Sequence, residues 1–403
     1  MLNKFYFIIY KNIPKSTQKI SLSTFDYIKK FIGTNDQLVI VDARILTFRE
    51  NKENIYSYKS KNVEFIKIKN FKDFFKLLNK NSYCFIDLNY TFRDYILFFF
   101  IKLKRFKIIL FNNIGYYSQA TSAQNKKNFF FSFLIIFFNH LIFKILLLLS
   151  LLPRIYCYFE SSQTRINSLN RSLSKNLQKN FFLKNIFYFK KIIRINSKYF
   201  DKIKSNKEIN EEKYVVYVDN GFDHPDRILV DGQPKDTDRR IYFEQLSKFL
   251  NQLGDYYKSN VIFCCHPKSP IYKKGHYFYQ LFNFCKITYN TDYYLERSKV
   301  AVFQISSLIN KAILINKRII LTKSNLLGTY FREKLSDLNA QIDLVNVDLS
   351  RVEDLNFSKI EKKIKKKIKF YSSYITANHV INKNLNSFDQ IKKFLQINRF
   401  KPK

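Results

Sequence analysis

Short apolar runs with the composition of β-strands alternate with helix-length segments along most of the chain. In the first half these runs include residues 4–10 (KFYFIIY), 37–42 (QLVIVD) and 106–111 (FKIILF). In the second half, residues 214–218 (YVVYV) and 261–265 (VIFCC) repeat the pattern. Strands that alternate with helices in this way are typical of βαβ units, which build parallel sheets. The sequence therefore predicts an α/β fold with Rossmann-like domains.

The length of the chain predicts two such domains. Its 403 residues are enough for two cores of ordinary size. A polar, charged stretch without apolar periodicity is predicted to link them. No G-x-G-x-x-G motif occurs, which argues against a standard dinucleotide site. The predicted parts are an N-terminal domain over 1–195, a linker over 196–213, a C-terminal domain over 214–375, and a terminal helix within 376–403 that packs back on the first domain.

Basic residues exceed acidic ones by a wide margin, and the excess is concentrated in one region. The chain has 70 Lys and Arg against 32 Asp and Glu, a formal net charge of +38. Such a charge indicates nucleic acid, an anionic membrane or a phosphorylated substrate, although a bias toward A/T-rich codons also enriches Lys. Between Asp94 and Asp201, 17 basic residues occur with Glu160 as the only acidic one. We therefore expect an anionic surface to contact the first domain and the chemistry to lie in the second half.

The most apolar segment, residues 129–152, lies within this basic region. It has about the 20 residues that a bilayer-spanning helix needs, but Asn139, His140 and Lys144 interrupt it. On a helical wheel these three residues form one polar flank beside a broad apolar face. An interfacial helix on an anionic membrane is favoured over a spanning helix or an internal one. We expect a cytoplasmic protein that is peripheral on the inner face of the plasma membrane.

The cysteines indicate neither a disulfide framework nor a zinc site. There are five, Cys84, Cys157, Cys264, Cys265 and Cys285, and none of them forms a C-x-x-C pair. Cys264 and Cys265 lie in a predicted strand, where we expect them to pack as small hydrophobic side chains. The N-terminal residues MLNKFYFIIY are predicted to form a first strand and not a secretion signal. A reducing cytoplasm fits this pattern.

A histidine at the end of the strand over 261–265 is the sharpest chemical signal in the chain. In His266-Pro267-Lys268 the proline ends the strand and holds His266 extended at the edge of the sheet. A histidine in this position can donate a hydrogen bond or a proton to a leaving phosphate near neutral pH, and Lys268 adds a positive charge. Ligands of open α/β sheets bind outside the carboxyl ends of the strands, so a functional role is favoured over a structural accident.

A pair of serines follows a second strand further along the chain. Ser306 and Ser307 come after the strand-like run 300–304 and before a short helical pattern. The first amides of a helix attract anions, so these serines are candidates for phosphate binding, with an ordinary helix cap as the competing explanation. We expect this strand and the strand before His266 to be neighbours, so that both polar ends face one ligand. Thr291 is predicted to cap the short helix that follows it.

Carboxylates at two other strand ends are candidates for a catalytic base. Asp219 directly follows a strand, in a loop that also holds His224, and Asp87 ends a strand-like run of the first half. Either carboxylate, or His224, could deprotonate or orient a hydroxyl. The loop lacks recognised metal-ligand spacing, so no metal site is predicted. His276 and His379 show no partner pattern and are expected at the surface.

The segment around these motifs resembles a known family. Residues 261–269 (VIFCCHPKS), Thr291 with Leu295, and residues 303–321 (FQISSLINKAILINKRIIL) carry the resemblance. They are similar to the C-terminal half of bacterial GT-B-fold glycosyltransferases of surface-polysaccharide assembly, in particular the sialyltransferase-like capsule and lipopolysaccharide group with His-Pro and Ser-Ser/Thr motifs. The resemblance covers roughly residues 214–325.

The resemblance implies two Rossmann-like domains that face each other across a cleft. It also implies that His266 contacts the donor phosphate and acts as general acid. Ser306 and Ser307 would bind the donor phosphate, and the positive charge of Lys268, read from the sequence itself, makes it a further candidate for phosphate binding. Asn220 stands where the family has a second acidic residue, so the base remains open between Asp219 and Asp87.

Together these features predict an inverting, metal-independent glycosyltransferase. It would move a sugar from a CMP- or UDP-linked donor to a glycan or lipid-linked acceptor in cell-surface polysaccharide biosynthesis. The first domain would serve the acceptor and the membrane, and the second would bind the nucleotide-sugar, a co-substrate beside which no cofactor is expected. The alternatives are a nucleotide-sugar 2-epimerase of the same fold and a basic nucleic-acid-binding protein. No recognised nucleic-acid module occurs, so no nucleic acid partner is expected.

Overall fold

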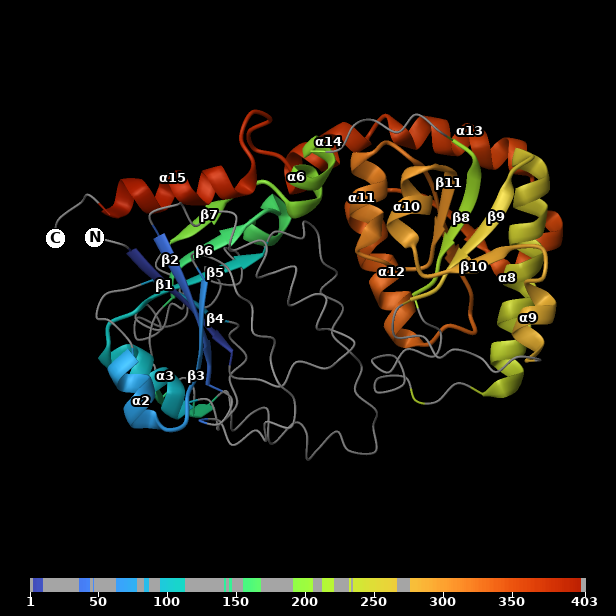
Figure 1. Ribbon diagram of the computed structural model, residues 1–403. Helices are drawn as coiled ribbons and strands as arrows, with labels where there is room; N and C mark the ends of the chain where they lie inside the picture. Colours follow the sequence, from blue (N-terminus) through green and yellow to red (C-terminus); the bar gives the residue numbers. More distant parts are fainter. Residues whose placement is uncertain are drawn as a thin grey trace. The chain divides into compact units, whose positions relative to one another are not determined.

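The chain forms two compact units, each built on one parallel sheet (Figure 1). Unit 1 comprises the described residues of Met1–Asn113, Phe130–Asn196 and Ile381–Lys403, and unit 2 comprises those of Ser197–Val380. The predicted α/β class is confirmed. The computed structural model describes residues 3–9, 36–43, 46, 63–77, 83–86, 95–112, 141–142, 145–146, 155–167, 191–205, 212–220, 232, 235–266 and 276–399.

Unit 1 is organised around a seven-stranded sheet with the strand order β3-β2-β1-β4-β5-β6-β7. The chain builds outward from β1 on one side and then continues on the other side with β4, which is the 3-2-1-4-5-6 order of a Rossmann fold. The strands are nearly continuous apolar runs, as required when helices cover both faces of a parallel sheet. They are β1 (Asn3–Ile9), β2 (Asp36–Asp42), β3 (Val63–Lys67), β4 (Tyr83–Ile86), β5 (Lys107–Asn112), β6 (Ile155–Glu160) and β7 (Ile192–Arg194).

Helices cover both faces of this sheet. On one face, α2 (Phe71–Leu77) and α3 (Tyr95–Leu103) bury their apolar sides against the strands. On the other face lies α15 (Ser387–Arg399), which comes from the end of the chain. The ring of Phe394 on α15 meets that of Phe159 on β6 edge to face, with 5.6 Å between centroids. The C-terminal helix is therefore part of the core of unit 1.

Unit 2 has a six-stranded sheet with the order β10-β9-β8-β11-β12-β13, again the 3-2-1-4-5-6 pattern. The expectation that the strands before His266 and Ser306 are neighbours is wrong, because β8 lies between them. After β10 the chain returns to the other side of the first strand of the unit, and sequence spacing alone does not reveal this crossing. The strands are β8 (Tyr214–Val218), β9 (Asn260–Cys264), β10 (Lys286–Thr288), β11 (Ser298–Phe303), β12 (Arg318–Lys323) and β13 (Val345–Asp348).

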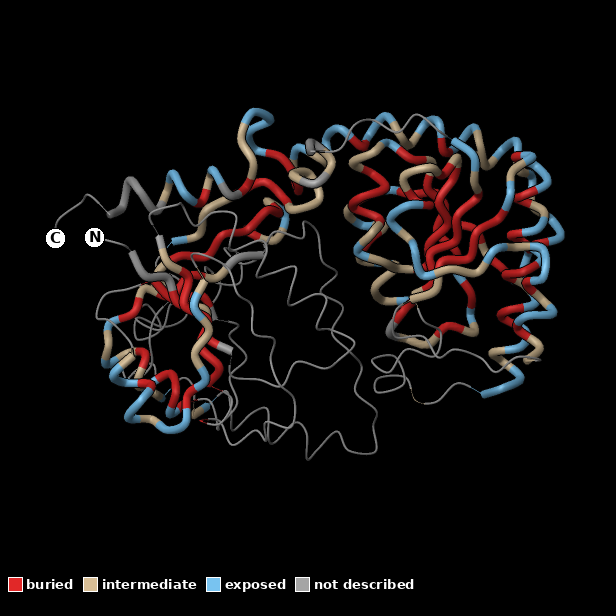
Figure 2. Tube along the Cα trace, viewed as in Figure 1, coloured by how far each residue is buried: buried red, intermediate tan, exposed pale blue. Residues whose placement is uncertain are grey.

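Two buried clusters fill the space on either side of this sheet, and exposed residues lie on the outer sides of the helices (Figure 2). One cluster joins the strands to α8 and α13, and the other joins them to α10, α11 and α14. The helices are α6 (Lys198–Ser205), α8 (Asp236–Tyr257), α9 (Tyr277–Leu281), α10 (Thr291–Glu296), α11 (Leu308–Leu314), α12 (Thr329–Gln341), the 3-10 helix η6 (Leu349–Asp354), α13 (Phe357–Ile368) and α14 (Tyr371–Asn378).

The sequence analysis did not predict several of these elements. The polar segment 196–213, expected as a linker, contains α6. The sequence analysis also missed β10, α12 and α14. Of the apolar segment 129–152, the structure describes Leu141, Ile142, Ile145 and Leu146, all in helical conformation. Within the residues that the structure describes, no helix is both long and apolar enough to span a bilayer.

Candidate functional site

The carboxyl edge of the sheet in unit 2 brings together several of the predicted residues. β8 and β11 are the neighbouring strands at which the strand order reverses, and ligands of such sheets bind outside this point. Asp219 directly follows β8, and Gln304 directly follows β11. His266 lies two residues beyond the end of β9, on the other side of β8. The sheet thus places the predicted carboxylate between the predicted histidine and the predicted serines.

Asp219 and His266 are in direct contact. The backbone N–H of His266 donates to Oδ2 of Asp219 at an N–O distance of 3.5 Å. The backbone N–H of Asp219 donates to the carbonyl of Cys264 at 2.9 Å, which extends the ladder between the two strands by one residue. The Asp219 side chain is buried, and His266 is half-buried. A buried carboxylate therefore holds the backbone from which the predicted general acid projects.

Ser306 and Ser307 form the turn between β11 and α11. Ser307 is the N-cap residue of α11, and Oγ of the preceding Ser306 accepts a hydrogen bond from the first helical amide, the N–H of Leu308, at 3.2 Å. Oγ of Ser307, which is exposed, accepts from the hydroxyl of Tyr199 on α6 at 3.4 Å. In both bonds the serine oxygen is the acceptor, so neither of these two bonds uses the hydroxyl proton of the serine. Capping and anion binding are compatible at this turn.

An ion-pair cluster around a buried lysine links α11 to α10. Lys311 on α11 is only 1% exposed, and its Nζ lies 2.7 Å from Oδ1 of Asp292 and 2.7 Å from Oε1 of Glu296. Two carboxylates satisfy the buried ammonium group, as burial requires. Lys311 therefore positions the helix after the serine turn, and its charge is already neutralised by protein groups.

His379 supports the same helix from α14, and its expected surface position is wrong. The imidazole is fully buried, with Nδ1 2.9 Å from Oγ of Ser197 and Nε2 3.2 Å from Oδ1 of Asn310 on α11. The hydroxyl of Tyr374 also donates to Oδ1 of Asn310, at 2.9 Å. Burial lowers the pKa of His379 from 6.5 to about 3, so the ring is neutral. Local sequence gives no sign of this burial, because every partner is distant in the chain.

Of the other predicted residues, some have structural contacts in unit 2 and some lie outside the described residues. Thr291 is the first residue of α10 and not its cap, and its hydroxyl hydrogen-bonds the thiol of Cys264. Burial raises the pKa of Cys264 to about 12, which is consistent with its expected packing role. His276, expected at the surface, is half-buried and caps α9, because its Nδ1 accepts from the N–H of Phe278 at 3.2 Å. Asp87, His224 and Lys268 lie outside the described residues.

The sequence analysis missed Gln304, Tyr199 and Lys311 as site residues. Gln304 and Lys311 leave a signal, since each is a polar residue within an otherwise apolar run, VAVFQI and SSLINKAIL. Tyr199 leaves none, because it lies in a segment predicted to be a linker. Within the described part of the chain, no group of three or more His, Cys, Asp or Glu side chains has a metal-binding arrangement.

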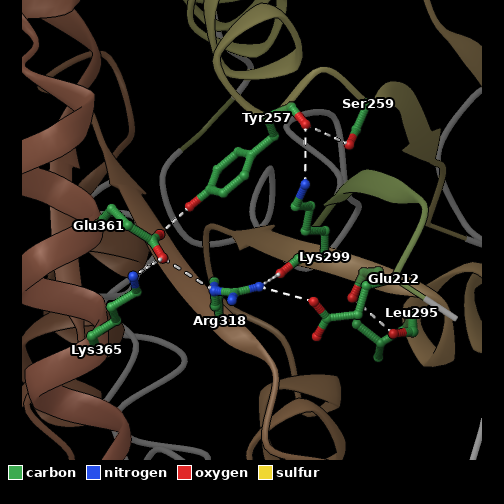
Figure 3. A network of polar contacts seen from close by, with 9 residues as sticks. Glu212, Tyr257, Ser259, Leu295, Lys299, Arg318, Glu361 and Lys365 are labelled. Carbon is green, nitrogen blue, oxygen red and sulfur yellow. Dashed lines mark hydrogen bonds and ion pairs between the residues drawn. The ribbon is translucent and has the colours of Figure 1, made fainter. Parts of the chain in front are cut away.

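A second polar network occupies the opposite, amino edge of the same sheet (Figure 3). Arg318, the first residue of β12, contacts Glu212 at 3.0 Å and Glu361 of α13 at 3.2 Å. The hydroxyl of Tyr257, at the end of α8, also donates to Glu361. Burial and Glu361 raise the pKa of Tyr257. These contacts join α8, β12 and α13, and they lie away from the edge where ligands of this fold bind.

Comparison with known proteins supports the fold. No protein-family model and no curated protein sequence matches the chain. Among solved structures, a variant of the wall teichoic acid polymerase TagF matches with a TM-score of 0.51 at 11% identity, over 98% of this chain and 88% of that chain. A glycosyltransferase from Rickettsia africae matches with a TM-score of 0.47 at 12% identity, over 98% of this chain and 99% of the other. The UDP-GlcNAc 2-epimerase of Methanocaldococcus jannaschii gives 0.47 at 11%, with the same coverage.

The likeness to TagF extends over nearly the whole chain, and it agrees with the strand order found in each unit. The chain has the GT-B fold with its two Rossmann-like domains, as the sequence predicts. At this level of identity the likeness establishes the fold alone.

Proposed function

We propose that the chain is an inverting, metal-independent glycosyltransferase that uses a CMP- or UDP-linked sugar. Its acceptor would be a glycan or a lipid-linked glycan of cell-surface polysaccharide biosynthesis. The observation that carries the proposal is the contact between Asp219 and His266 at the strand-order reversal of unit 2, beside the serine turn. A carboxylate, an imidazole and two hydroxyls at this edge are the groups that glycosyl transfer from a phosphate requires.

In the proposed reaction an acceptor hydroxyl attacks the anomeric carbon of the donor sugar. Asp219 or Asp87 takes the hydroxyl proton as the new C–O bond forms. The bond from the anomeric carbon to the phosphate oxygen breaks, and its electron pair leaves with the phosphate. His266 donates a proton or a hydrogen bond to that oxygen, and Ser306, Ser307 and Lys268 bind the phosphate. Attack opposite the leaving group inverts the configuration.

A donor screen tests the proposal directly. Thermal shift across CMP-, UDP-, GDP- and CDP-linked sugars should identify one preferred nucleotide. With that donor, His266→Ala should lower the turnover by roughly 10²-fold or more, the usual contribution of general acid catalysis. Ser307→Ala should weaken donor binding by roughly fivefold, the worth of one hydrogen bond. Unchanged binding and turnover in both variants would contradict the assigned site.

His276→Ala is the matched control, because it removes a histidine whose ring caps α9. It should keep the wild-type turnover. The two candidate bases are compared through Asp219→Asn and Asp87→Asn, of which the true base should lower the turnover by roughly 10²-fold or more. Product analysis with UDP-linked N-acetylhexosamine in the absence of acceptor separates transfer from 2-epimerisation. A gel shift with a steep salt dependence would instead favour nucleic acid binding.

We also propose that unit 1 rests on the inner face of the plasma membrane. Its helices α2 and α3 pack side by side through Phe71 and Phe100, whose rings stack with centroids 4.9 Å apart. Ile142 and Leu146 pack against the same core cluster. Six large apolar side chains on these helices and the adjoining segment are exposed, and such a gathering is typical of an interaction surface. They are Phe75, Ile96, Phe99, Leu103, Leu141 and Ile145.

Vesicle flotation tests this location. The full chain should float with vesicles of anionic lipid, and Leu141→Ser with Ile145→Ser should reduce the floated fraction several-fold. Ile241→Ser with Tyr279→Ser is the matched control, since it alters two exposed apolar side chains of unit 2. Equal flotation of the two double variants would argue against the proposed surface.

A further inference from the structure

A row of polar side chains continues one apolar layer of the sheet in unit 2. On adjacent strands, four large side chains pair in register and are buried in one cluster: Phe263, Tyr217, Val302 and Ile320. Side chains two residues further along a strand lie on the same face. The next layer toward the carboxyl edge is therefore Cys265, Asp219, Gln304 and Thr322. Continuing the register by one residue makes Gln304 the cross-strand neighbour of Asp219.

Among the described residues, the side chain of Gln304 differs from those of Asp219 and Thr322 in having no hydrogen-bond partner. Its side chain is only 1% exposed, and within the described part of the chain neither Nε2 nor Oε1 forms a hydrogen bond. By contrast, the hydroxyl of Thr322 donates to the carbonyl of Phe303 at 3.3 Å, and Asp219 accepts from His266. Buried amides are almost always paired, and an unpaired one at a ligand-binding edge indicates a group that a ligand completes.

The chemistry of an amide defines the ligand. Gln304 offers a donor and an acceptor without charge, and a hydroxyl group matches both because it accepts and donates at one atom. A phosphate or carboxylate oxygen only accepts, and Oε1 of the amide would face it without a partner. We propose that Gln304 binds a ring hydroxyl of the transferred sugar, with Nε2 donating and Oε1 accepting.

This proposal rests on the proposed glycosyl transfer and adds a specificity determinant to the same site. Ribose also carries hydroxyls, but the register places Gln304 beside Asp219, a group assigned to the reaction at the anomeric centre. A sugar with a hydroxyl that reaches Gln304 forms both hydrogen bonds with the amide, and the deoxy analogue of that sugar leaves the amide without these bonds. The site then favours the hydroxylated sugar by the cost of an unsatisfied buried group.

The test compares the full-length chain with its Gln304→Met variant. Methionine has a similar length and no polar amide, so it removes the unpaired group without a large cavity. The melting temperature of the unliganded variant should equal or exceed that of the wild type. Thr322→Val is the control in the same row, and it should lower the melting temperature because it removes a hydroxyl whose partner is in place. A clear drop in the Gln304→Met melting temperature would show that the amide has structural partners, and would overturn the proposal.

Calorimetry with three ligands distinguishes the two sources of the hydroxyl. Wild type and variant should bind the free nucleotide equally, and the variant should bind the preferred nucleotide-sugar roughly tenfold or more weakly. Wild type should discriminate against the deoxy-sugar donor, and the variant should not. Loss of affinity for the free nucleotide would assign Gln304 to the ribose and overturn the proposal. If wild type and Gln304→Met prefer the hydroxylated donor over the deoxy donor to the same extent, the role of Gln304 is overturned and the proposed function is not. If the wild type binds nucleotide-sugars no more tightly than free nucleotide, the proposed function is overturned as well.

Discussion

At the scale of single residues, the buried imidazole of His379 has a positioning role. His379 joins Ser197, at the start of α6, to Asn310 on α11, and so holds the helix that follows the serine turn. The imidazole is neutral because burial disfavours its charged form. A neutral ring in the folded chain and a protonated ring in the unfolded chain differ in charge, and stability therefore depends on pH.

His379 should make the protein sensitive to mild acid. Its pKa is about 3 in the folded chain and near 6.5 in the unfolded chain, so between these values the unfolded state binds one more proton. The contribution of neutral His379 to the free energy of unfolding is fully present above pH 6.5. It is lost as the pH falls below this value, by about 1.4 kcal/mol per pH unit. Denaturant unfolding at pH 7 and pH 5 should show a loss of about 2 kcal/mol from this residue.

His379→Gln isolates this contribution. The variant should be less stable at pH 7 because hydrogen bonds inside the core are disturbed, but the difference from wild type should shrink as pH falls to 5. His276→Gln is the control at another histidine with a structural bond. A constant difference between wild type and His379→Gln across this range would mean that the buried imidazole does not titrate as described.

At the scale of elements, the strands follow closely from the sequence and the sheet order does not. Apolar runs such as YVVYV predict β8 residue by residue, since a parallel strand buried on both faces has no room for polar residues. β10 has only three residues and produces no such run. The sequence predicts that Asp219 and His266 lie at the same edge of the sheet, because both follow strands. The partners of His379 and Lys311 could not be predicted, because they depend on packing between helices that are distant in sequence.

The link between α10 and α11 is a stability element that can be tested. Lys311→Ala should lower the free energy of unfolding by about 3 kcal/mol, because it leaves a cavity in place of the buried lysine side chain and removes the partner of two partly exposed carboxylates. A triple variant, Lys311→Met with Asp292→Asn and Glu296→Gln, should recover most of this loss, since it removes all three charges together. Denaturant unfolding measures both variants. A triple variant that is no more stable than Lys311→Ala would show that the charges are not the cause.

At the scale of the whole molecule, two units of the same strand order are joined by two crossings of the chain. One crossing lies between Asn196 and Ser197, and the other lies between Val380 and Ile381. On the side of unit 2, the N–H of Ser197 donates to the carbonyl of His379 at 2.8 Å. On the side of unit 1, Oδ1 of Asn196 accepts from the N–H of Ile381 at 2.7 Å. The two crossings are thus held next to each other by bonds within each unit.

Asn196 should be essential for retaining the C-terminal segment. Its Nδ2 donates to the carbonyls of Asn382 and Leu385, at 2.8 and 2.7 Å, and its side chain is fully buried. Asn196→Ala leaves these carbonyls and the N–H of Ile381 without partners, at a cost of about 3 kcal/mol. Amide hydrogen exchange should rise most in residues 381–386. Asn384→Ala, at an exposed position in the same loop, should leave exchange unchanged; equal exchange in both variants would contradict the role of Asn196.

The placement of α15 in the core of unit 1 has a consequence during synthesis on the ribosome. The described residues of unit 2 all lie between Ser197 and Val380, and all of them are translated before Ile381. Unit 2 can therefore fold while the sheet of unit 1, although translated first, still lacks the helix that covers Phe159. In this protein the N-terminal domain is begun first and completed last, because the cluster around Phe159 lacks α15 until residues 387–399 have been translated.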